Sequence, residues 1–348
     1  MEMLKMTQLK MIYGARIEQA RKLSGYTQKE LAEKIGVNQS AIAMYEKGQI
    51  IPSPDVLVKV AELTHFLPSF FEVCPLEEFS KGSLSYRSLR SVTAKEEDRA
   101  YQNAKLMFEH LNIMSKSFVL PRMQLPILNE KPEKSAEITR ASLGIAPDSP
   151  IKNLTNTLEH NGVIILSLPL FLKKIDAFST WIDLQGKRPL IAESFGKPGD
   201  RLRFSLAHET AHLVMHHPPR TTVKIMEKEA NDFASALLMP KCIAENEFVR
   251  PVSLLSLAQL KLKWGMSMQA LIYRARDLKI ITERQATYLF TQIASNGWKT
   301  REPSNLDIKI ETPQIFRKMV EGLYDNPEKY AYAMGLDDSR ASEMTLFS

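Results

Sequence analysis

Hydrophobic positions recur at helical spacing along most of the chain. Residues 11–73 carry closely spaced apolar positions three and four apart, separated by short polar turns, which predicts a bundle of short helices. From Thr93 to about Phe118 the same spacing continues without a break, and Thr93 with Glu96 forms a capping-box signature. The apolar positions of this segment are Ala100, Ala104, Met107, Leu111 and Met114. We expect one long helix, which serves either as a dimer element or as a spacer.

The second half of the chain mixes helical and strand patterns. Three prolines within 120–132 predict a linker. The predicted elements beyond it are helices at 135–145 and 152–162, short strands at 163–170 and 177–194, helices at 200–217 and 222–238, and a helical region at 252–297. The segment 177–194 is predicted to form a hairpin that turns at 185–187. Pro218 ends the predicted helix at 200–217. The fold class is therefore mainly α with a small β-sheet, α+β.

These patterns predict five consecutive regions. They are a helical bundle at 11–75, a connecting helix and linker at 76–131 with irregular structure at 76–92, an α+β domain at 132–245, a helical C-terminal domain at 246–302 and a tail at 303–348. A chain of 348 residues has room for two or three domains of ordinary size.

Composition adds little to this picture, but it argues against a disulfide-rich, a secreted or a membrane-spanning protein. The formal net charge of +6 permits a nucleic-acid partner without establishing one. The two cysteines, Cys74 and Cys242, are far apart, so neither a disulfide framework nor a paired-cysteine metal site is predicted. The N-terminus lacks a secretory pattern, and the longest apolar runs are too short to span a bilayer. We therefore expect a cytoplasmic protein with no membrane partner.

The segment from Arg16 to Val73 has the spacing of a five-helix DNA-binding bundle. Thr27 is placed to cap a second helix, Gly36 permits a tight turn, and Asn38 begins a third helix. The stretch "ARKLSGYTQKELAEKIGVNQSAIAMYEKGQIIPSPDVLVKVAEL" closely resembles the XRE-type (Cro/repressor-like) helix-turn-helix, a lambda-repressor-like fold. The resemblance implies binding to a double-stranded DNA operator.

By this resemblance, the third helix enters the major groove. The residues implied to face base edges are Asn38, Gln39, Ser40 and Met44. The amides of asparagine and glutamine suit adenine, whereas methionine is a weaker reader of bases. Gln28 is implied to meet a phosphate at the start of the second helix, and Lys47 adds a further phosphate contact.

The stretch "FSLAHETAHLVMHH" contains the pattern His-Glu-x-x-His at 208–212. Residues four apart lie on one face of a helix, so His208 and His212 can bind one metal ion, and Glu209 can act as general base toward a water. His216 lies too far along the axis to join a tetrahedral site with His208. A third ligand must come from elsewhere. The next helix offers Glu227 and Glu229. Glu229 directly precedes the apolar stripe and can point along the interface, whereas Glu227 lies on a different side and is expected to face solvent.

The same region resembles the ImmA/IrrE family of zinc metallopeptidases, which have a zincin-like fold. "GKPGDRLRFSLAHETAHLVMHH" and "EKEANDFASALLMP" carry the two halves of the family pattern, with Ala211 where many members have glycine. The resemblance covers roughly 133–245. It implies one zinc ion per chain held by His208, His212 and Glu229, with Glu209 catalytic. Residues 254–303 resemble the helical tail found behind such domains, or more faintly a second helix-turn-helix with the basic residues Arg274, Arg276 and Lys279.

Two functions follow from these resemblances. The first is a DNA-binding transcriptional regulator whose zinc endopeptidase domain cleaves a repressor-type protein, or itself, in response to a signal. The second is a non-enzymatic repressor, or an antitoxin-like autorepressor, whose metallopeptidase-like domain is a sensor or binds a toxin partner. We expect a homodimer in both cases, because helix-turn-helix proteins usually read two half-sites.

Overall fold

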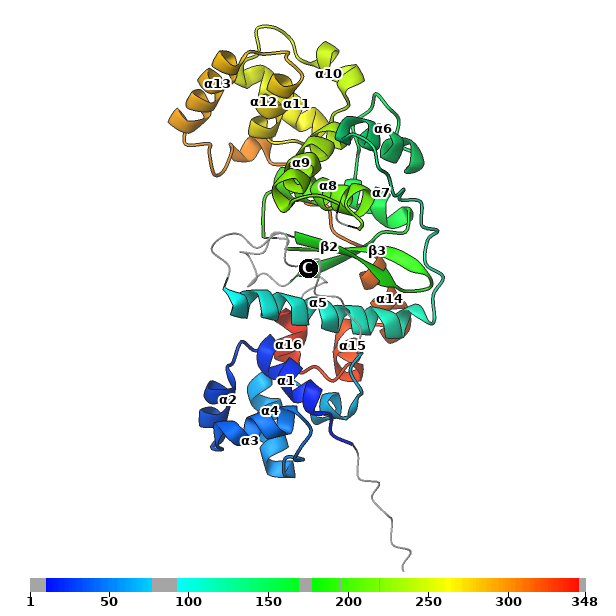
Figure 1. Ribbon diagram of the computed structural model, residues 1–348, viewed down its shortest axis with the longest axis vertical. Coiled ribbons are helices and arrows are strands. Elements are labelled where there is room, and N and C mark those ends of the chain that lie inside the picture. The colour runs from blue at the N-terminus through cyan, green and yellow to red at the C-terminus, as the bar shows by residue number, and fades with distance from the viewer. Residues whose placement is uncertain (1–10, 77–92, 169–176, 195, 219, 344–348) are drawn as a thin grey trace, which may run out of the picture. The chain divides into compact units, whose positions relative to one another are not determined.

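The computed structural model describes residues 11–76, 93–168, 177–194, 196–218 and 220–343 (Figure 1). The segment 76–92, predicted to be irregular, lies almost wholly outside these ranges. The chain folds into two compact units. Unit 1 takes its described residues from 11–76, 93–117 and 317–343, and unit 2 takes them from between 118 and 316. No helix among the described residues is long and apolar enough to cross a membrane.

Unit 1 begins with the predicted helical bundle. Its elements are α1 (Gly14–Leu23), α2 (Gln28–Ile35), α3 (Gln39–Glu46), α4 (Pro54–Thr64) and the short 3-10 helix η1 (Pro68–Glu72). The hydroxyl of Thr27 accepts from the backbone N–H of Glu30, whose carboxylate accepts from the N–H of Thr27, so α2 starts with a complete capping box. Gly36 takes the left-handed conformation with φ of 76°, which allows the tight turn into α3.

The long helix predicted from Thr93 is α5 (Ala94–Ser115), and its capping box with Glu96 is present. It packs on α1 inside unit 1. Glu109, which is buried, forms an ion pair with the buried Arg16 of α1, and Arg99 donates to the carbonyl of Leu23. The faces that carry these residues are therefore taken up by the helical bundle, so the helix is part of this unit and not only a link out of it.

The C-terminal residues give unit 1 three further helices, which the sequence patterns did not predict. They are α14 (Ile315–Tyr324), which crosses from unit 2, α15 (Pro327–Ala333) and α16 (Asp338–Glu343). A β-bridge joins Phe66 to Leu336, and the backbone N–H of Leu67 donates to the carbonyl of Gly335 at 2.8 Å. The segment predicted as a tail from 303 is thus largely a structural part of the unit that contains the N-terminal bundle.

A buried histidine in unit 1 predicts a fall in stability at acidic pH. Burial, with a smaller effect of the charge on Arg16, lowers the pKa of His110 to about 3, and its Nδ1 lies 2.6 Å from the Tyr330 hydroxyl. Below a pH of about 6.5 the histidine is protonated in the unfolded chain but stays neutral in the folded protein. The contribution of neutral His110 to the free energy of unfolding is therefore complete above pH of about 6.5 and is lost as the pH falls toward 3. We expect a loss of about 2 kcal/mol between pH 7 and pH 5, measured by urea unfolding. The same loss in His110→Gln would show that another group is responsible.

Unit 2 is built on a three-stranded sheet in the order β1-β3-β2. The strands are β1 (Ile164–Leu168), β2 (Ala177–Asp183) and β3 (Lys187–Ser194). β2 and β3 form the predicted hairpin, with Ala177 opposite Glu193 and Asp183 opposite Lys187, whereas β1 runs parallel to β3. The hairpin places β2 at an edge of the described sheet.

Helices cover this sheet and extend beyond it. α8 (Gly199–Met215) packs on β2 and β3, α9 (Val223–Leu238) packs on α8, and α6 (Pro132–Ser142) packs on both helices (Figure 1). The remaining elements are α7 (Leu154–His160), α10 (Lys241–Glu247), α11 (Leu254–Trp264), α12 (Met268–Asp277), α13 (Glu283–Ser295) and the short η4 (Ser304–Leu306).

Small residues bring α8 and α9 close together. The two helices pack on each other, and each contributes two completely buried alanines: Ala207, Ala211, Ala230 and Ala234. Side chains of this size let two helix backbones approach, so polar groups on the edges of the interface can meet. The alanine at 211 therefore fits the same packing role as the glycine that it replaces in the family pattern.

Candidate metal centre and DNA-binding module

The two histidines of the His-Glu-x-x-His pattern meet on one face of α8. His208 is completely buried, and its Nε2 lies 3.0 Å from Nε2 of His212. One turn of α-helix separates the two residues, so both rings point the same way. Glu209 is also buried. These three predicted site residues are brought together as the spacing required.

The third member of this cluster is the carboxylate of Glu227, which comes from α9. Its Oε2 lies 3.4 Å from Nε2 of His208 and its Oε1 lies 3.3 Å from Nε2 of His212. Among the described residues, these three side chains form the group whose ligand atoms all lie within 4.8 Å of one another. Glu229, named from the resemblance as the third ligand, instead lies 3.1 Å from Nε2 of His216.

Helix geometry explains this correction. Glu227 precedes the buried Ala230 by three residues and Ala234 by seven, so it lies on the side of α9 that faces α8. Glu229 is two residues further on and is therefore rotated by about 200° from Glu227. The position of a glutamate in the helical period therefore indicates which one lies beside the two histidines better than its distance in sequence from the apolar stripe does.

Hydrogen bonds around the histidines set the direction of their lone pairs. Nδ1 of His208 lies 2.9 Å from the amide oxygen of Asn231, an acceptor, so the proton belongs on Nδ1 and the lone pair on Nε2. Nδ1 of His212 lies 3.0 Å from Nδ1 of His216, whose other nitrogen meets Glu229. Glu229 therefore accepts from His216, which in turn accepts from His212.

The pKa of His216 agrees with this chain of hydrogen bonds. Burial, and then the neighbouring His212, lowers the pKa of the His216 imidazole. A neutral ring has one N–H to donate to Glu229 and one lone pair to accept from His212. The result at His212 is the same as at His208, with Nε2 left as the ligand atom.

The donor set fits zinc. In a tetrahedral site with zinc–ligand distances near 2.1 Å, neighbouring ligand atoms lie about 3.4 Å apart. The two imidazole nitrogens lie 3.0 Å apart, and each lies 3.3 or 3.4 Å from a different oxygen of the Glu227 carboxylate, so these separations are close to this value. Two histidines and one glutamate with a fourth position left open are a common catalytic arrangement.

Glu209 is held from the sheet. The hydroxyl of Ser179, on the edge strand β2, donates to Oε2 of Glu209 at 2.7 Å. The bond crosses between two elements thirty residues apart in sequence. Neither Ser179 nor Asn231 was among the predicted site residues. Asn231 was within reach of the sequence pattern, since it follows Glu227 by one turn of α9, but Ser179 carried no such signal.

The predicted base-reading residues lie along α3, with Asn38, Gln39 and Ser40 at its start, and Lys47 follows its end. The side chains of Asn38, Gln39, Ser40 and Lys47 are exposed, and that of Met44 is half-buried. Ile42, on the other side of the helix, is completely buried in the bundle. The polar side of α3 is thus free for a ligand, as recognition of a major groove requires.

Gln28 differs from its predicted role. Its amide donates to Oε2 of Glu46 at 2.7 Å instead of pointing outward. Glu46 also accepts from the guanidinium of Arg21, and both of these residues are buried. This set of bonds ties the end of α3 to α1 and α2, so Gln28 orients the helix rather than standing free for a phosphate.

Arg274 also has a structural role. It is buried, and its guanidinium forms two bonds of 2.9 and 2.7 Å to the carboxylate of Glu133 and one to the carbonyl of Met239. This arginine joins α12 to α6 and to the end of α9. It therefore gives no support to α12 as a second DNA-reading helix.

Comparison with known proteins agrees with this division. A helix-turn-helix family matches residues 17–66, and the IrrE N-terminal-like domain of the M78 peptidases matches residues 158–276. The HTH-type transcriptional regulator ImmR of Bacillus subtilis (strain 168) is 40% identical over 53 residues, which cover 15% of this chain and 42% of ImmR. The chain thus matches less than half of the length of ImmR.

A second relative is matched over nearly its whole length. The uncharacterized HTH-type transcriptional regulator YazB of the same organism is 34% identical over 67 residues, which cover 19% of this chain and 94% of YazB. Together with the exposed polar side of α3 and the histidine–glutamate cluster of α8 and α9, these matches assign both halves of the protein. The chain belongs to the XRE-type helix-turn-helix transcriptional regulators and carries an IrrE N-terminal-like domain of the M78 peptidase family.

Proposed function

We propose that this regulator is a zinc endopeptidase as well as a DNA-binding protein. The zinc ligands are His208, His212 and Glu227, and the general base is Glu209. The observation that carries the proposal is the placement of a buried, oriented carboxylate next to a donor set of zinc geometry. A purely structural zinc site has no use for such a carboxylate, because its four positions are closed by protein ligands.

The residues of the chain divide the chemical work. Zinc, when bound, supplies Lewis acidity toward a peptide carbonyl and an attacking water. Glu209 takes the proton of that water and returns it to the leaving amine, while Ser179 fixes one of its carboxylate oxygens. Asn231 and His216 hold the two imidazole rings in the orientation that presents Nε2.

The edge strand suggests how a peptide is held. Within the described sheet β2 pairs only with β3, so its other edge offers backbone groups to an extended chain. Because Ser179 lies on β2 and bonds to Glu209, a peptide paired with this strand would pass beside the general base. The substrate that we propose is a repressor-type protein, or this chain itself, cleaved in response to a signal.

DNA recognition is assigned to the exposed start of α3, in a homodimer that reads two half-sites. Gln39→Ala is expected to weaken binding to the operator by about 1–3 kcal/mol, because a glutamine amide can make two hydrogen bonds to one adenine. The measurement is a titration of operator and of random DNA at one fixed salt concentration. Gln124→Ala, which removes an exposed glutamine of unit 2, is the matched control. Operator affinity equal to that of the wild type would contradict this role of Gln39.

The experiment that tests the peptidase compares the wild type with Glu209→Gln in the native host. Zinc content is measured on the purified proteins, and mass spectrometry of terminal peptides searches the cells for new protein ends. We expect both proteins to hold zinc and only the wild type to generate new ends. Glu245→Gln, which changes an exposed glutamate of α10, controls for loss of a carboxylate. Full zinc content without any Glu209-dependent cleavage would overturn the peptidase and favour a sensor domain.

A further inference from the structure

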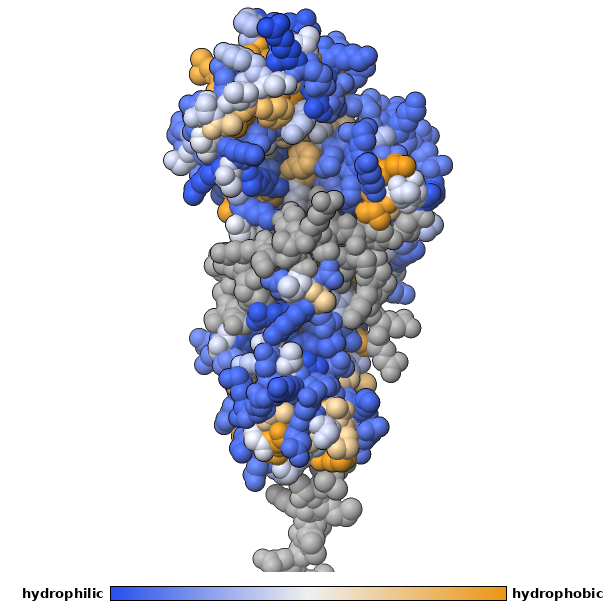
Figure 2. All heavy atoms as spheres, turned by 60° about the vertical axis from the view of Figure 1, so that its left-hand side comes forward, coloured by the Kyte–Doolittle hydropathy of each residue, from blue (hydrophilic) through white to orange (hydrophobic). Residues whose placement is uncertain are grey.

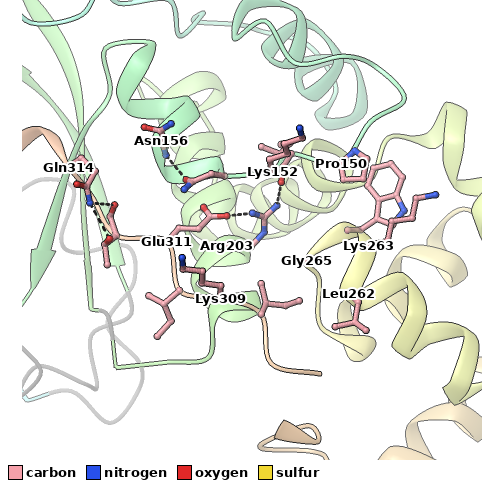
Figure 3. Close-up of a pocket in the computed structure, with 16 residues that line it drawn as sticks. Pro150, Lys152, Asn156, Arg203, Leu262, Lys263, Gly265, Lys309, Glu311 and Gln314 are labelled. Atoms are coloured by element: carbon pink, nitrogen blue, oxygen red, sulfur yellow. Dashed lines mark hydrogen bonds and ion pairs between the residues drawn. The ribbon is translucent and has the colours of Figure 1, made fainter. Parts of the chain in front are cut away.

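A cavity of about 470 Å³ lies inside unit 2, away from the histidine cluster (Figure 3). It is bounded by the segment 150–153 and the start of α7, by Arg203 of α8, by the end of α11 with Gly265, and by the segment 308–314. Its volume falls in the range of about 300–1,000 Å³ that is typical of sites for small molecules. It is too small for a folded partner and larger than an inorganic ion needs.

The lining of this cavity is strongly basic. Lys152, Lys263, Lys309 and Arg203 contribute to it, whereas Glu311 is its one acidic residue. Lys263 forms an ion pair with Glu247, and Arg203 forms one with Glu311. Lys152 and Lys309 are exposed and make no ion pair among the described residues. The cavity therefore has an excess of positive charge that no acidic group of the described residues balances.

Arg203 forms part of the cavity wall and is held in place by hydrogen bonds. Its side chain is almost completely buried, it donates to the carbonyl of Ile151 at 2.8 Å, and it points toward Glu311 in Figure 3. The N–H on Nε is buried and has no hydrogen-bond partner among the described residues. An unsatisfied buried donor costs free energy. The guanidinium also adds its positive charge to the wall of the cavity.

Gly265 packs closely against this guanidinium. A Cβ built at this glycine would lie 2.5 Å from Nε of Arg203, and its φ of 67° is left-handed. Any other residue would fill the space next to the guanidinium and would also be strained. Trp264, the neighbour of Gly265, adds an apolar wall, and Asn156 and Gln314 add amide groups.

We propose that this cavity binds a small organic anion that carries phosphate or carboxylate groups. The anionic group would contact the exposed Lys152 and Lys309, with the charge of Arg203 in the wall behind it, and a polar organic body would lie against Asn156 and Gln314. Arg203 lies five residues before His208 on α8, which is about 7.5 Å along the helix. A ligand here therefore contacts the same helix that carries the two candidate histidine ligands. Its use as a signal for cleavage rests on the proposed peptidase, but its binding does not.

Binding is tested on the full chain by tryptophan fluorescence and calorimetry at 150 mM salt. The probes are inorganic phosphate, citrate and adenosine monophosphate, which separate charge alone, carboxylates and a phosphate ester. We expect citrate or adenosine monophosphate to bind more tightly than inorganic phosphate. Lys152→Ala and Lys309→Ala should each weaken that binding about tenfold, because each removes one charge-assisted contact. Lys224→Ala, at an exposed lysine of α9 away from the cavity, should leave it unchanged.

Two results would overturn the proposal. One is the absence of binding by all three probes at millimolar concentration. The other is wild-type affinity in both cavity variants, which would place the anion elsewhere on this basic protein. Because the readout is binding, a protein without peptidase activity can still pass this test, and an active peptidase can fail it.

Discussion

Glu227→Ala is expected to abolish stoichiometric zinc binding, whereas Glu229→Ala should keep zinc with an affinity reduced by about 10–100-fold. The two carboxylates stand two residues apart on α9, but only that of Glu227 lies within 3.4 Å of the Nε2 atoms of both histidines. Loss of Glu227 leaves two imidazoles as the only protein ligands. Loss of Glu229 leaves all three and removes the acceptor that orients His216 and, through it, His212.

The measurement is zinc content by mass spectrometry after dialysis against a zinc buffer, followed by competition with a chelator to obtain the affinity. Glu245→Ala, on the exposed surface of α10, is the control for removing a glutamate near the end of this domain. Circular dichroism excludes unfolding as the cause of metal loss. The reverse order, with zinc lost from Glu229→Ala and retained by Glu227→Ala, would restore the ligand set implied by the family resemblance.

Arg340→Ala is expected to destabilise unit 1 by about 2–4 kcal/mol, the range for breaking a buried, charged hydrogen-bond set. Arg340 belongs to α16, and only 2% of its surface is exposed. Its Nη2 donates to the hydroxyl of Ser24 at 2.7 Å and to the carbonyl of Thr64 at 2.9 Å, and its guanidinium lies over the ring of Phe66. One side chain near the C-terminus thus joins α1 to α4 of the helix-turn-helix bundle.

Hydrogen exchange of the α1 and α4 amides, read by mass spectrometry, measures this effect directly. Faster exchange in these helices, with unchanged exchange in α8 and α9, is the expected pattern. Arg317→Ala removes an arginine of α14 that pairs on the surface with Glu321, and it should cost only a few tenths of a kcal/mol. If Arg340→Ala exchanges like Arg317→Ala, the C-terminal helices are dispensable for the bundle.

Local signals in the sequence were reliable wherever a short stretch of chain determines the structure. The capping boxes at Thr27 and Thr93, the turn at Gly36 and the pairing of His208 with His212 all depend on residues within four positions of one another. Their geometry is fixed by the helix itself, so the residue types and spacings were sufficient.

The features that the sequence patterns did not predict are contacts between distant segments of the chain. Ser179 reaches Glu209 only because the hairpin packs on α8, and Asp337 pairs with His65 across 272 positions. No periodic pattern records which helix faces which, so the C-terminal helices looked like an unstructured tail. The choice between Glu227 and Glu229 was different, because Glu227 was expected to face solvent, whereas its carboxylate lies between the two histidines of α8.

The construction of unit 1 from both ends of the chain has a consequence for any cut in unit 2. Such a cut turns one molecule into two pieces, but each piece still carries part of the bundle: the helix-turn-helix on one and α15 with α16 on the other. Their association then changes from intramolecular to bimolecular and loses the high effective concentration that the intact chain provides. The effect of such a cut would therefore depend on protein concentration: the two pieces would stay associated at high concentration and separate on dilution, so a cut would act as a concentration threshold instead of a simple off-switch.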